Sequence, residues 1–354
     1  MPESSTSQSS RDRSATDLPS VFARYQSAVG NALRTELDGR SLPIYDTLRY
    51  YMGWAESNGT QIHGPEGKRL RPTLCLLACE AVGGNPEDAL PVAVAIELVH
   101  NFSLIHDDIE DGDRTRHHRP TLWVIWGEPT AIVAGNNLLA VGDIATQRLQ
   151  EAGAQTAVAV GHILTERYLS MMEGQYLDIS YEGRTDVTVD DYLAMIERKT
   201  GALIEGSLEL GALVGAGGSG EVVDGLRAVG DDFGRIFQIR DDVLGIWGGP
   251  ALGKPIGADI TRKKNSLPVV HVLEQAHGAE RSELQRIYSE DEISPANVER
   301  VLDVMDGIGT QRWCQEQAEA RWVRARERLN SLKLSADASR ELLELGEFLL
   351  VREA

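Results

Sequence analysis

The sequence predicts an all-α protein that folds as a single helical bundle. Apolar residues recur three and four positions apart over most of the chain, as in LPVAVAIELVHNFSLIHDDIED (90–111) and VDDYLAMIERKTGALIEGSLELGALVG (189–215). This is the pattern of helices with a buried face. The alternation that is typical of strands never persists for long, and no internal repeat of fixed period occurs. Together these observations favour roughly ten or more helices.

Segments with Gly and Pro divide this helical pattern into elements. In chain order the breaks are GPEGKRLRP (64–72), VGGNPEDALP (82–91), RHHRPT (116–121), GAGGSGE (215–221) and WGGPALGKPIG (247–257). None is a linker between independent domains, because even the Gly-rich segment 215–221 is only long enough to turn between two helices. We therefore expect a disordered tail rich in Ser and Thr over residues 1–20, and one all-α domain over residues 21–354.

The composition argues against several classes of protein. The chain has 354 residues, and 35 Lys and Arg against 54 Asp and Glu give a formal net charge of −19. This charge argues against a general affinity for nucleic acid or anionic lipid. The longest weakly polar stretch, 201–218, contains two glutamates and is too short to span a membrane. Cys75, Cys79 and Cys314 form no disulfide framework and the N-terminus lacks a signal peptide, so we expect a cytoplasmic protein with no membrane span.

The sharpest chemical signal is the acidic segment HDDIEDGDRTRHHRP (106–120). On a helix that advances about 100° per residue, Asp107, Glu110 and Asp111 fall on one side, and Asp108 lies one step around. Carboxylates this close repel one another, which raises the pKa of at least one of them unless a cation compensates. A solvated acidic helix end would have a similar composition. Here, however, the acids follow the apolar NFSLI and precede three arginines, which favours a functional site.

A second acidic site is predicted in FGRIFQIRDDVLG (233–245). Gln238, Asp241, Asp242 and Gly245 follow the i, i+3, i+4, i+7 spacing of one helical face. Because unpaired buried carboxylates are costly, a cation is expected beside them. Mg²⁺ fits best, since it binds through a few carboxylates together with substrate phosphates. No cluster of His and Cys indicates zinc.

Two further acidic pairs are interpreted as structural. Asp190 and Asp191 follow Thr188 at a predicted helix start, where acids interact favourably with the helix dipole. Asp231 and Asp232 lie about ten residues before the second site and have no basic loop after them.

Basic residues occur in four small groups despite the acidic total. Each group lies at a helix start or in a loop, where backbone N–H groups also bind anions. The groups are Lys68, Arg69 and Arg71; Arg114, Arg116 and Arg119; Arg198 and Lys199; and Lys254, Arg262, Lys263 and Lys264. Two acidic metal sites and four basic turns indicate two phosphorylated substrates.

The motifs and their order resemble those of the trans-isoprenyl diphosphate synthases, the polyprenyl synthetase family, which includes farnesyl and geranylgeranyl diphosphate synthases. The resemblance covers residues 60–270 and rests on GKRLRP, HDDIED, EGQYLD (173–178), KTG (199–201), FQIRDD and GK…D…K. It implies a single all-α bundle around a deep central cavity. It also implies a prenyltransferase, usually a homodimer, that joins isopentenyl diphosphate to an allylic diphosphate by ionisation, condensation and elimination.

In this family the two acidic motifs face each other across the cavity and hold Mg²⁺ on the allylic diphosphate. Carried onto this sequence, the metal ligands are Asp107, Asp108, Asp111, Asp241 and Asp242, with Gln175 and Gln238 in support. A diphosphate carries a charge of about −3, and Asp107, Asp111 and Asp241 together carry another −3, so about three Mg²⁺ ions would balance the charge.

The resemblance also implies roles for individual side chains. Arg116, Lys199 and Lys254 would stabilise the charge on the departing diphosphate, and Thr200 would support the allylic carbocation. The implied catalytic residues are Asp107, Asp111, Arg116, Lys199, Thr200, Gln238, Asp241 and Lys254. The implied pocket for isopentenyl diphosphate consists of Lys68, Arg71, His100 and His117.

Two positions depart from the family's pattern. His117 stands where a second arginine often occurs, and it would bind phosphate more weakly or only when protonated. Gly245 stands where many members have aspartate. Because Gly245 lies a full turn from Asp241, Asp241 could bind a metal without a third acid. The effect of Gly245→Asp on Mg²⁺ affinity is therefore expected to test the site.

Product length in this family depends on the bulk just upstream of the first acidic motif. Phe102, five residues before Asp107, resembles the aromatic floor of geranylgeranyl diphosphate synthases, and Ser103 leaves room above it. A helical wheel places Phe102 about 140° from the Asp107 face, so plain core packing is the alternative. We expect a C20 product made from farnesyl diphosphate, with C15 (farnesyl) and C25 (geranylfarnesyl) products next.

Two other functions stay open. A class I terpene cyclase shares the fold and the first acidic motif but needs no second diphosphate site, so GKRLRP and the lack of an NDxxSxxxE-like motif count against it. A non-catalytic regulatory subunit of a synthase would show damage across the first motif and the basic loops, whereas here only His117 and Gly245 depart.

Overall fold

The computed structural model describes residues 19–62, 64, 67–249 and 255–352. The predicted all-α fold is confirmed, because these residues are mostly helical and their only strands are β1 (Thr115–Arg116) and β2 (Arg119–Pro120), which form one short hairpin. Residues 1–18 of the predicted tail lie outside the described residues, and α1 begins at Ser20. The division into a tail and one domain stays a prediction.

The helices follow one another through short connections. Those of the first half are α1 (Ser20–Leu37), α2 (Ile44–Tyr51), α3 (Leu70–Ala81), α4 (Pro86–Glu110), α5 (Leu122–Trp126), α6 (Glu128–Thr146), the 3₁₀ helix η1 (Gln147–Ala152) and α7 (Ala154–Tyr181). Those of the second half are α8 (Val189–Ile196), the π-helix η2 (Glu197–Gly201), α9 (Ala202–Ala216), α10 (Glu221–Trp247), α11 (Ala258–Thr261), α12 (Leu267–Gln275), α13 (Gly278–Ser289), α14 (Pro295–Ile308), α15 (Thr310–Ser331) and α16 (Ala336–Val351).

Helix α4 is a central element and carries the first acidic segment at its C-terminal end. Its start is fixed by Asn85, whose side chain accepts a hydrogen bond from the Glu87 N–H, and by Pro86 in the first turn. The helix packs chiefly against α6, α3 and α9. Acids at the C-terminal end of a helix oppose its dipole. The position of Asp107 and Glu110 there therefore indicates that nearby cations compensate.

The same helix is long and apolar enough to cross a membrane, by length and composition only, and it is the one such helix in the described part of the chain. More than half of its apolar window is buried inside the bundle, and side chains such as Leu98 and Val99 are fully enclosed. We interpret α4 as a core helix, and the expectation of no membrane span is not contradicted.

Glycines let three core helices approach one another closely. A Cβ at Gly211 of α9 would overlap the backbone of Cys75 in α3, and a Cβ at Gly234 of α10 would stand 2.7 Å from Cα of Gly201. Cys75 and Cys79 are buried free thiols at the α3–α9 contact, where they serve as small core residues. This packing gathers the start of α3, η2 and the middle of α10 around one region.

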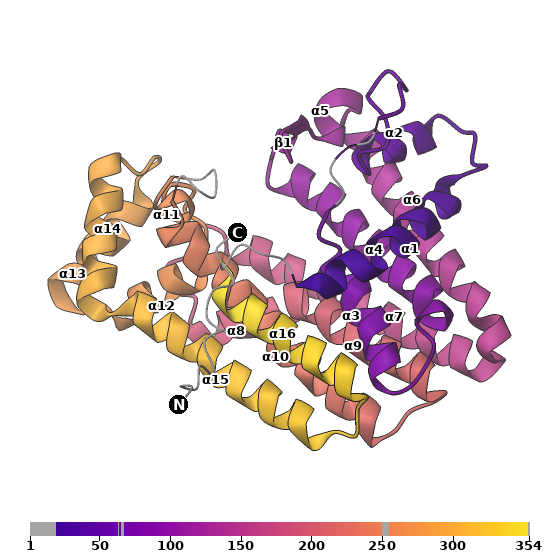
Figure 1. The fold of residues 1–354 in the computed structure, drawn as a ribbon. Coiled ribbons are helices and arrows are strands. Elements are labelled where there is room, and N and C mark those ends of the chain that lie inside the picture. The colour runs from indigo at the N-terminus through magenta and orange to yellow at the C-terminus, as the bar shows by residue number, and fades with distance from the viewer. Residues whose placement is uncertain (1–18, 63, 65–66, 250–254, 353–354) are drawn as a thin grey trace, which may run out of the picture.

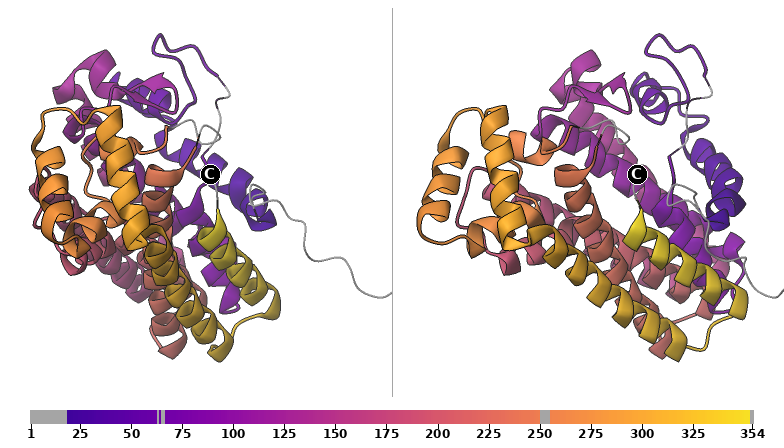
Figure 2. Two further views of the ribbon diagram at one scale, coloured as in Figure 1. Left: turned by 90° about the vertical axis from the view of Figure 1, so that its left-hand side faces the viewer. Right: turned by 60° about the vertical axis from the view of Figure 1, so that its left-hand side comes forward.

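Helices α11–α14 form a group at one side of the molecule, away from α1, α2 and the β-hairpin (Figures 1 and 2). A separate cluster of buried side chains joins this group to the end of α10, through residues such as Ile246, Ile260 and Val269. The last helix, α16, packs on α10 and α15, and the C-terminal end of the described chain lies close to α10 (Figure 1).

Candidate active site

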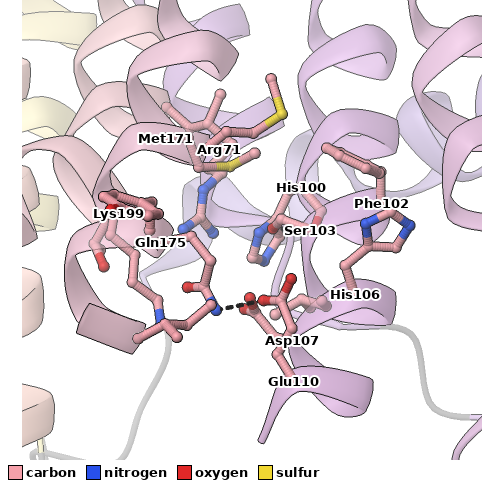
Figure 3. A pocket seen from close by; sticks show the side chains of 16 residues that line it. Arg71, His100, Phe102, Ser103, His106, Asp107, Glu110, Met171, Gln175 and Lys199 are labelled. Atoms are coloured by element: carbon pink, nitrogen blue, oxygen red, sulfur yellow. Dashed lines mark hydrogen bonds between the residues drawn. The ribbon is translucent and has the colours of Figure 1, made fainter. Parts of the chain in front are cut away.

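A cavity of about 400 Å³ opens between α4 and α7, with further walls from α3, η2 and α9 (Figure 3). It is lined by Arg71, His100, Phe102, Ser103, Leu104, His106, Asp107, Glu110, Met171, Met172, Gln175, Tyr176, Ile179, Lys199, Thr200 and Leu203. A cavity of this size holds a small-molecule ligand. The central cavity that the family resemblance implies is therefore present.

The two ends of the cavity differ in chemistry. Asp107, Gln175 and Lys199 gather at one end, whereas Phe102 and Met171 stand on opposite walls towards the other (Figure 3). Phe102 and Met171 are nearly fully buried, each with 4% of its surface exposed. The cavity therefore suits a molecule with a charged head and an apolar tail.

From the first acidic segment, Asp107 and Glu110 line the cavity, whereas Asp111 lies beside them without lining it. Burial raises the pKa of Asp107 to about 7, against the nearby charge of Lys199. Burial likewise raises the pKa of Asp111, and Lys199 again opposes the shift. Gln175 donates a 2.6 Å hydrogen bond to Glu110, and its own side-chain oxygen is buried without a partner. Carboxylate and amide oxygens are the ligands that a hard divalent cation prefers, and such a cation would offset the cost of burying them.

Asp108 does not line the cavity. Its side chain is 2% exposed and accepts a 2.7 Å hydrogen bond from Nε of Arg116. Burial raises the pKa of Asp108, and the Arg116 guanidinium opposes this shift. The position one step around the helix thus places Asp108 in an ion pair, while its second oxygen is buried without a hydrogen-bond partner. Its role as a metal ligand stays a prediction.

The KTG segment lies in the π-helical turn η2, a feature that recurs at functional sites. Lys199 forms a 2.5 Å ion pair with Asp178, the last residue of EGQYLD. Although burial disfavours the charged form, Asp178 and Asp107 raise the pKa of Lys199, which is therefore a cation. Gly174 of the same motif allows the contact, because a Cβ there would stand 2.6 Å from Cα of Lys199.

A chain of hydrogen bonds links η2 to α10. Thr200 donates to the side-chain oxygen of Gln238 at 2.7 Å, and the Gln238 amide donates to Asp242 at 2.9 Å. The second oxygen of Asp242 accepts from the Tyr192 hydroxyl at 2.5 Å and from the Leu267 N–H at 3.0 Å. Burial raises the pKa of Asp242 to about 6. Both of its oxygens already have protein donors, so this placement favours a structural role over the predicted metal ligation.

Asp241, the next acid on α10, has a side chain that is 45% exposed. It pairs with Arg352 near the end of the described chain. Arg352 also donates to the carbonyl of Phe237 at 3.1 Å, and its guanidinium lies 4.0 Å from the centre of the Phe237 ring. Arg240 donates in turn to the Arg352 carbonyl at 2.9 Å. These contacts hold the C-terminal end of α16 against the face of α10 that is predicted to bind metal.

Gly245 stands where many members of the family have a third acid. In the structure, a side chain from another helix, α11, occupies the space beside it. A Cβ at Gly245 would overlap the carboxylate of Asp259, which lies on α11 within the GK…D…K motif. Although burial opposes it, Asp242 and Asp259 raise the pKa of Lys264. Gly245 therefore makes room for a carboxylate. This corrects the expectation that Gly245→Asp would test the metal site, because the added side chain would collide with Asp259.

The acidic pairs that were interpreted as structural have structural partners. Asp191 forms a capping box with Thr188 at the start of α8. Asp232 is 1% exposed and accepts a 2.5 Å hydrogen bond from Arg324.

Comparison with known proteins decides the family. The family model for polyprenyl synthetase matches residues 53–305, which is more than half of the chain. The chain belongs to the polyprenyl synthetase family. It is 35% identical over 324 residues to the (2E,6E)-farnesyl diphosphate synthase of Mycobacterium tuberculosis, covering 90% of this chain and 88% of that protein. It is 37% identical over 305 residues to a geranylgeranyl diphosphate synthase of the same organism, covering 85% of each.

A solved structure gives the same result. The crystal structure of a polyprenyl synthetase from Streptomyces coelicolor A3(2) matches with a TM-score of 0.86 and 34% sequence identity, over 93% of this chain and 98% of that chain. The protein is therefore a polyprenyl diphosphate synthase in sequence and in fold.

Polyprenyl synthetases bind isopentenyl diphosphate and an allylic diphosphate, and they generally use Mg²⁺. The oxygens of Asp107, Asp111 and Gln175 fit this ion. Among the residues that the structure describes, no group of three or more His, Cys, Asp and Glu side chains is arranged to hold a metal.

Two of the residues predicted to bind isopentenyl diphosphate line the cavity of this polyprenyl synthetase. Burial lowers the pKa of Arg71 against the charge of Glu97, and Nε of Arg71 is buried without a hydrogen-bond partner. Burial and the charge of Arg71 hold the pKa of His100 well below its usual range, so its ring is neutral. Burial, with the charge of Arg352, also lowers the pKa of Lys68.

Other predicted residues lie elsewhere. His117 is the first turn residue of the β1–β2 hairpin, with a φ of 50°, and it does not line the cavity. Arg119 is structural, because it donates to the carbonyls of Tyr50 and Ala55 at 2.9 and 2.8 Å. Lys254 lies outside the described residues.

Four residues at the site were not predicted from the sequence: Asp178, Asp259, Met171 and Arg352. Asp178 and Asp259 had a signal, since they belong to the motifs EGQYLD and GK…D…K. Met171 and Arg352 had none, because packing alone brings α7 and α16 to the site.

Proposed function

We propose that this polyprenyl synthetase is a geranylgeranyl diphosphate synthase, which joins isopentenyl diphosphate to farnesyl diphosphate with Mg²⁺. One observation carries the proposal: a single cavity has Asp107 and Lys199 at one end and Phe102 and Met171 at the other. An allylic diphosphate fits this order, with its diphosphate at the charged end and its hydrocarbon chain between the apolar walls.

The donor set suits a divalent metal at the charged end. About three Mg²⁺ ions would be held by Asp107, Asp111 and Asp241. When bound, these ions would neutralise the charge of the diphosphate. Lys199, fixed by Asp178, places a permanent positive charge near Asp107. As the C–O bond of the allylic substrate breaks, this cation stabilises the charge that grows on the departing diphosphate.

Arg71 and His100, which line the same cavity, would bind isopentenyl diphosphate. Arg71 contributes charge and His100 contributes a hydrogen bond from a neutral ring. The double bond of isopentenyl diphosphate attacks the allylic carbocation and forms the new C–C bond. A proton then leaves the condensed cation for the released diphosphate, which restores an allylic product. No nucleophilic side chain is needed, so positioning and electrostatics supply the catalysis.

The proposed C20 length rests on Phe102, which lines the cavity although the helical wheel separated it from the Asp107 face. Ser103 also lines the cavity and leaves space beside Phe102. The relatives do not decide the length, since one is named a farnesyl and the other a geranylgeranyl diphosphate synthase. C15 and C25 products are therefore the alternatives.

We also propose a cytoplasmic homodimer. Apolar side chains on α6 and α7 are exposed, including Val133 at 51%, Leu169 at 44% and Tyr176 at 72%. Exposed apolar side chains gathered on neighbouring helices are typical of an interface. Sedimentation of the purified protein should show a dimer, and a monomer at micromolar concentration would contradict this. The buried free thiols of Cys75, Cys79 and Cys314 favour a reducing compartment.

Product analysis with Mg²⁺, isopentenyl diphosphate and each of the C5, C10 and C15 allylic starters tests the proposal. We expect C20 to accumulate, with farnesyl diphosphate as the best starter. Products that stop at C15 would favour a farnesyl diphosphate synthase. Hydrocarbon released from geranylgeranyl diphosphate without isopentenyl diphosphate would indicate a terpene cyclase. Inactivity that a partner protein relieves would indicate a regulatory subunit.

A further inference from the structure

The ring of Phe102 is supported by a second ring on the same helix. His106, one turn further along α4, packs edge-on against it, with ring centroids 4.8 Å apart and planes inclined by 67°. Both side chains line the cavity and lie next to each other on its α4 wall (Figure 3). The position of the predicted floor therefore depends on where the His106 ring stands.

His106 is in turn fixed by α6. Its Nε2 lies 3.2 Å from the carbonyl oxygen of Ile132. Because a carbonyl only accepts, Nε2 carries the proton in this hydrogen bond. The ring stands where Gly135 has no side chain. A Cβ at Gly135 would lie 2.6 Å from Cδ2 and Nε2 of His106, and 3.5 Å from Cδ2 of Phe102.

We propose that His106 and Gly135 position Phe102 and thereby help to set the length of the product. The inference rests on the proposed function, because it concerns how far a prenyl chain grows in this cavity. The missing side chain of Gly135 admits the His106 ring, and the His106 edge limits the rotamers that Phe102 adopts. Without this support the Phe102 ring turns away from its place on the wall, and the apolar end of the cavity becomes deeper.

A different role for His106 is that it orients Asp107, which follows it directly in the chain. The two roles have different readouts. An effect through Asp107 lowers turnover with every starter and leaves the product distribution unchanged. An effect through Phe102 changes the product distribution, because it acts on the space available to the chain and not on the departing diphosphate.

The test is the product distribution of His106→Ala from farnesyl diphosphate and isopentenyl diphosphate with Mg²⁺. We expect the ratio of longer product to wild-type product to rise about tenfold, which corresponds to about 1.4 kcal/mol. Gly135→Ala acts in the opposite direction, since its methyl group pushes both rings towards the cavity and shortens the product. Alanine is a better helix former than glycine, so this variant keeps α6 intact. His162→Ala, an exposed histidine on α7 away from the cavity, is the matched control and leaves the distribution unchanged.

A double variant shows whether His106 acts through Phe102. Phe102→Ala alone should lengthen the product. Adding His106→Ala should lengthen it no further, because the ring that His106 supports is gone. An unchanged distribution in His106→Ala and Gly135→Ala, or additive effects in the double variant, would overturn the inference alone. A wild-type protein that forms no condensation product would overturn the proposed function together with it, whereas a wild-type product of any length allows the shift to be measured.

Discussion

Asp107 shows how a functional residue lowers the stability of the free protein. Burial raises its pKa to about 7 from an ordinary value of 3.8, so the folded state binds the proton more tightly than the unfolded state. The folded protein therefore loses stability as the pH rises from about 4 through about 7. Above that pH the charged carboxylate stays buried, which lowers the free energy of unfolding. A bound cation would offset this loss.

We therefore expect Asp107→Asn to stabilise the protein in the absence of metal, and more so at high pH. The gain in the free energy of unfolding should be about 1–3 kcal/mol larger at pH 8 than at pH 5. Urea unfolding at the two pH values measures this difference. Asp186→Asn is the control and should give no such gain at pH 8, because the hydrogen bond from Arg184 lowers the pKa of Asp186. An equal effect of Asp107→Asn at both pH values would argue against the raised pKa.

Gly245 is a second residue whose role depends on its neighbour. We expect Gly245→Asp to lower turnover and to destabilise the protein by about 2 kcal/mol or more, because the new side chain overlaps Asp259. Turnover at saturating Mg²⁺ and urea unfolding check this. Gly249→Asp is the matched control, since nothing lies within 4 Å of a Cβ at that position. Activity that appears only after Gly245→Asp would show that the wild-type site is incomplete.

At the scale of elements, local periodicity predicts which face of a helix is polar but not what that face meets. It correctly separates Asp107, which lines the cavity, from Asp108, which pairs with Arg116. It does not predict Arg352, which reaches Asp241 from 111 residues away along the chain. The π-helical turn η2 was also not predicted, because it spans only Glu197–Gly201, which is shorter than the window over which apolar periodicity is recognised.

The close approach of α7 to η2 can be tested directly by substituting glycines of α7. Gly174→Ala should lower turnover and cost about 2 kcal/mol or more of stability, because its Cβ would stand 2.6 Å from Cα of Lys199 and two backbones would have to separate. Gly161→Ala, on the same helix with nothing within 4 Å, should instead stabilise by about 0.5–1 kcal/mol. Similar effects of the two variants would contradict the close approach of α7 to η2.

At the scale of the molecule, an acidic protein binds anions through a few local cations. The net charge is −19, yet Lys199 and Arg71 both line the cavity that Asp107 and Glu110 also line. The sequence predicted this combination, because the spacing within each motif places its charged side chains on one face of a helix. The family resemblance implied a deep central cavity, but the sequence did not predict the opposing wall at Met171, because that wall depends on how α4 and α7 pack.

The central claim is that one cavity, with its acidic residues at the charged end, carries out Mg²⁺-dependent condensation. The most direct test is the turnover of isopentenyl diphosphate with farnesyl diphosphate by the purified wild-type protein, Asp107→Ala and Asp241→Ala. Asp190→Ala, at the exposed start of α8, is the control. We expect activity from the wild type and the control, and a loss of about 10²-fold or more in the two site variants, because leaving-group stabilisation acts mainly in the transition state. Near-normal rates in either site variant would contradict the claim.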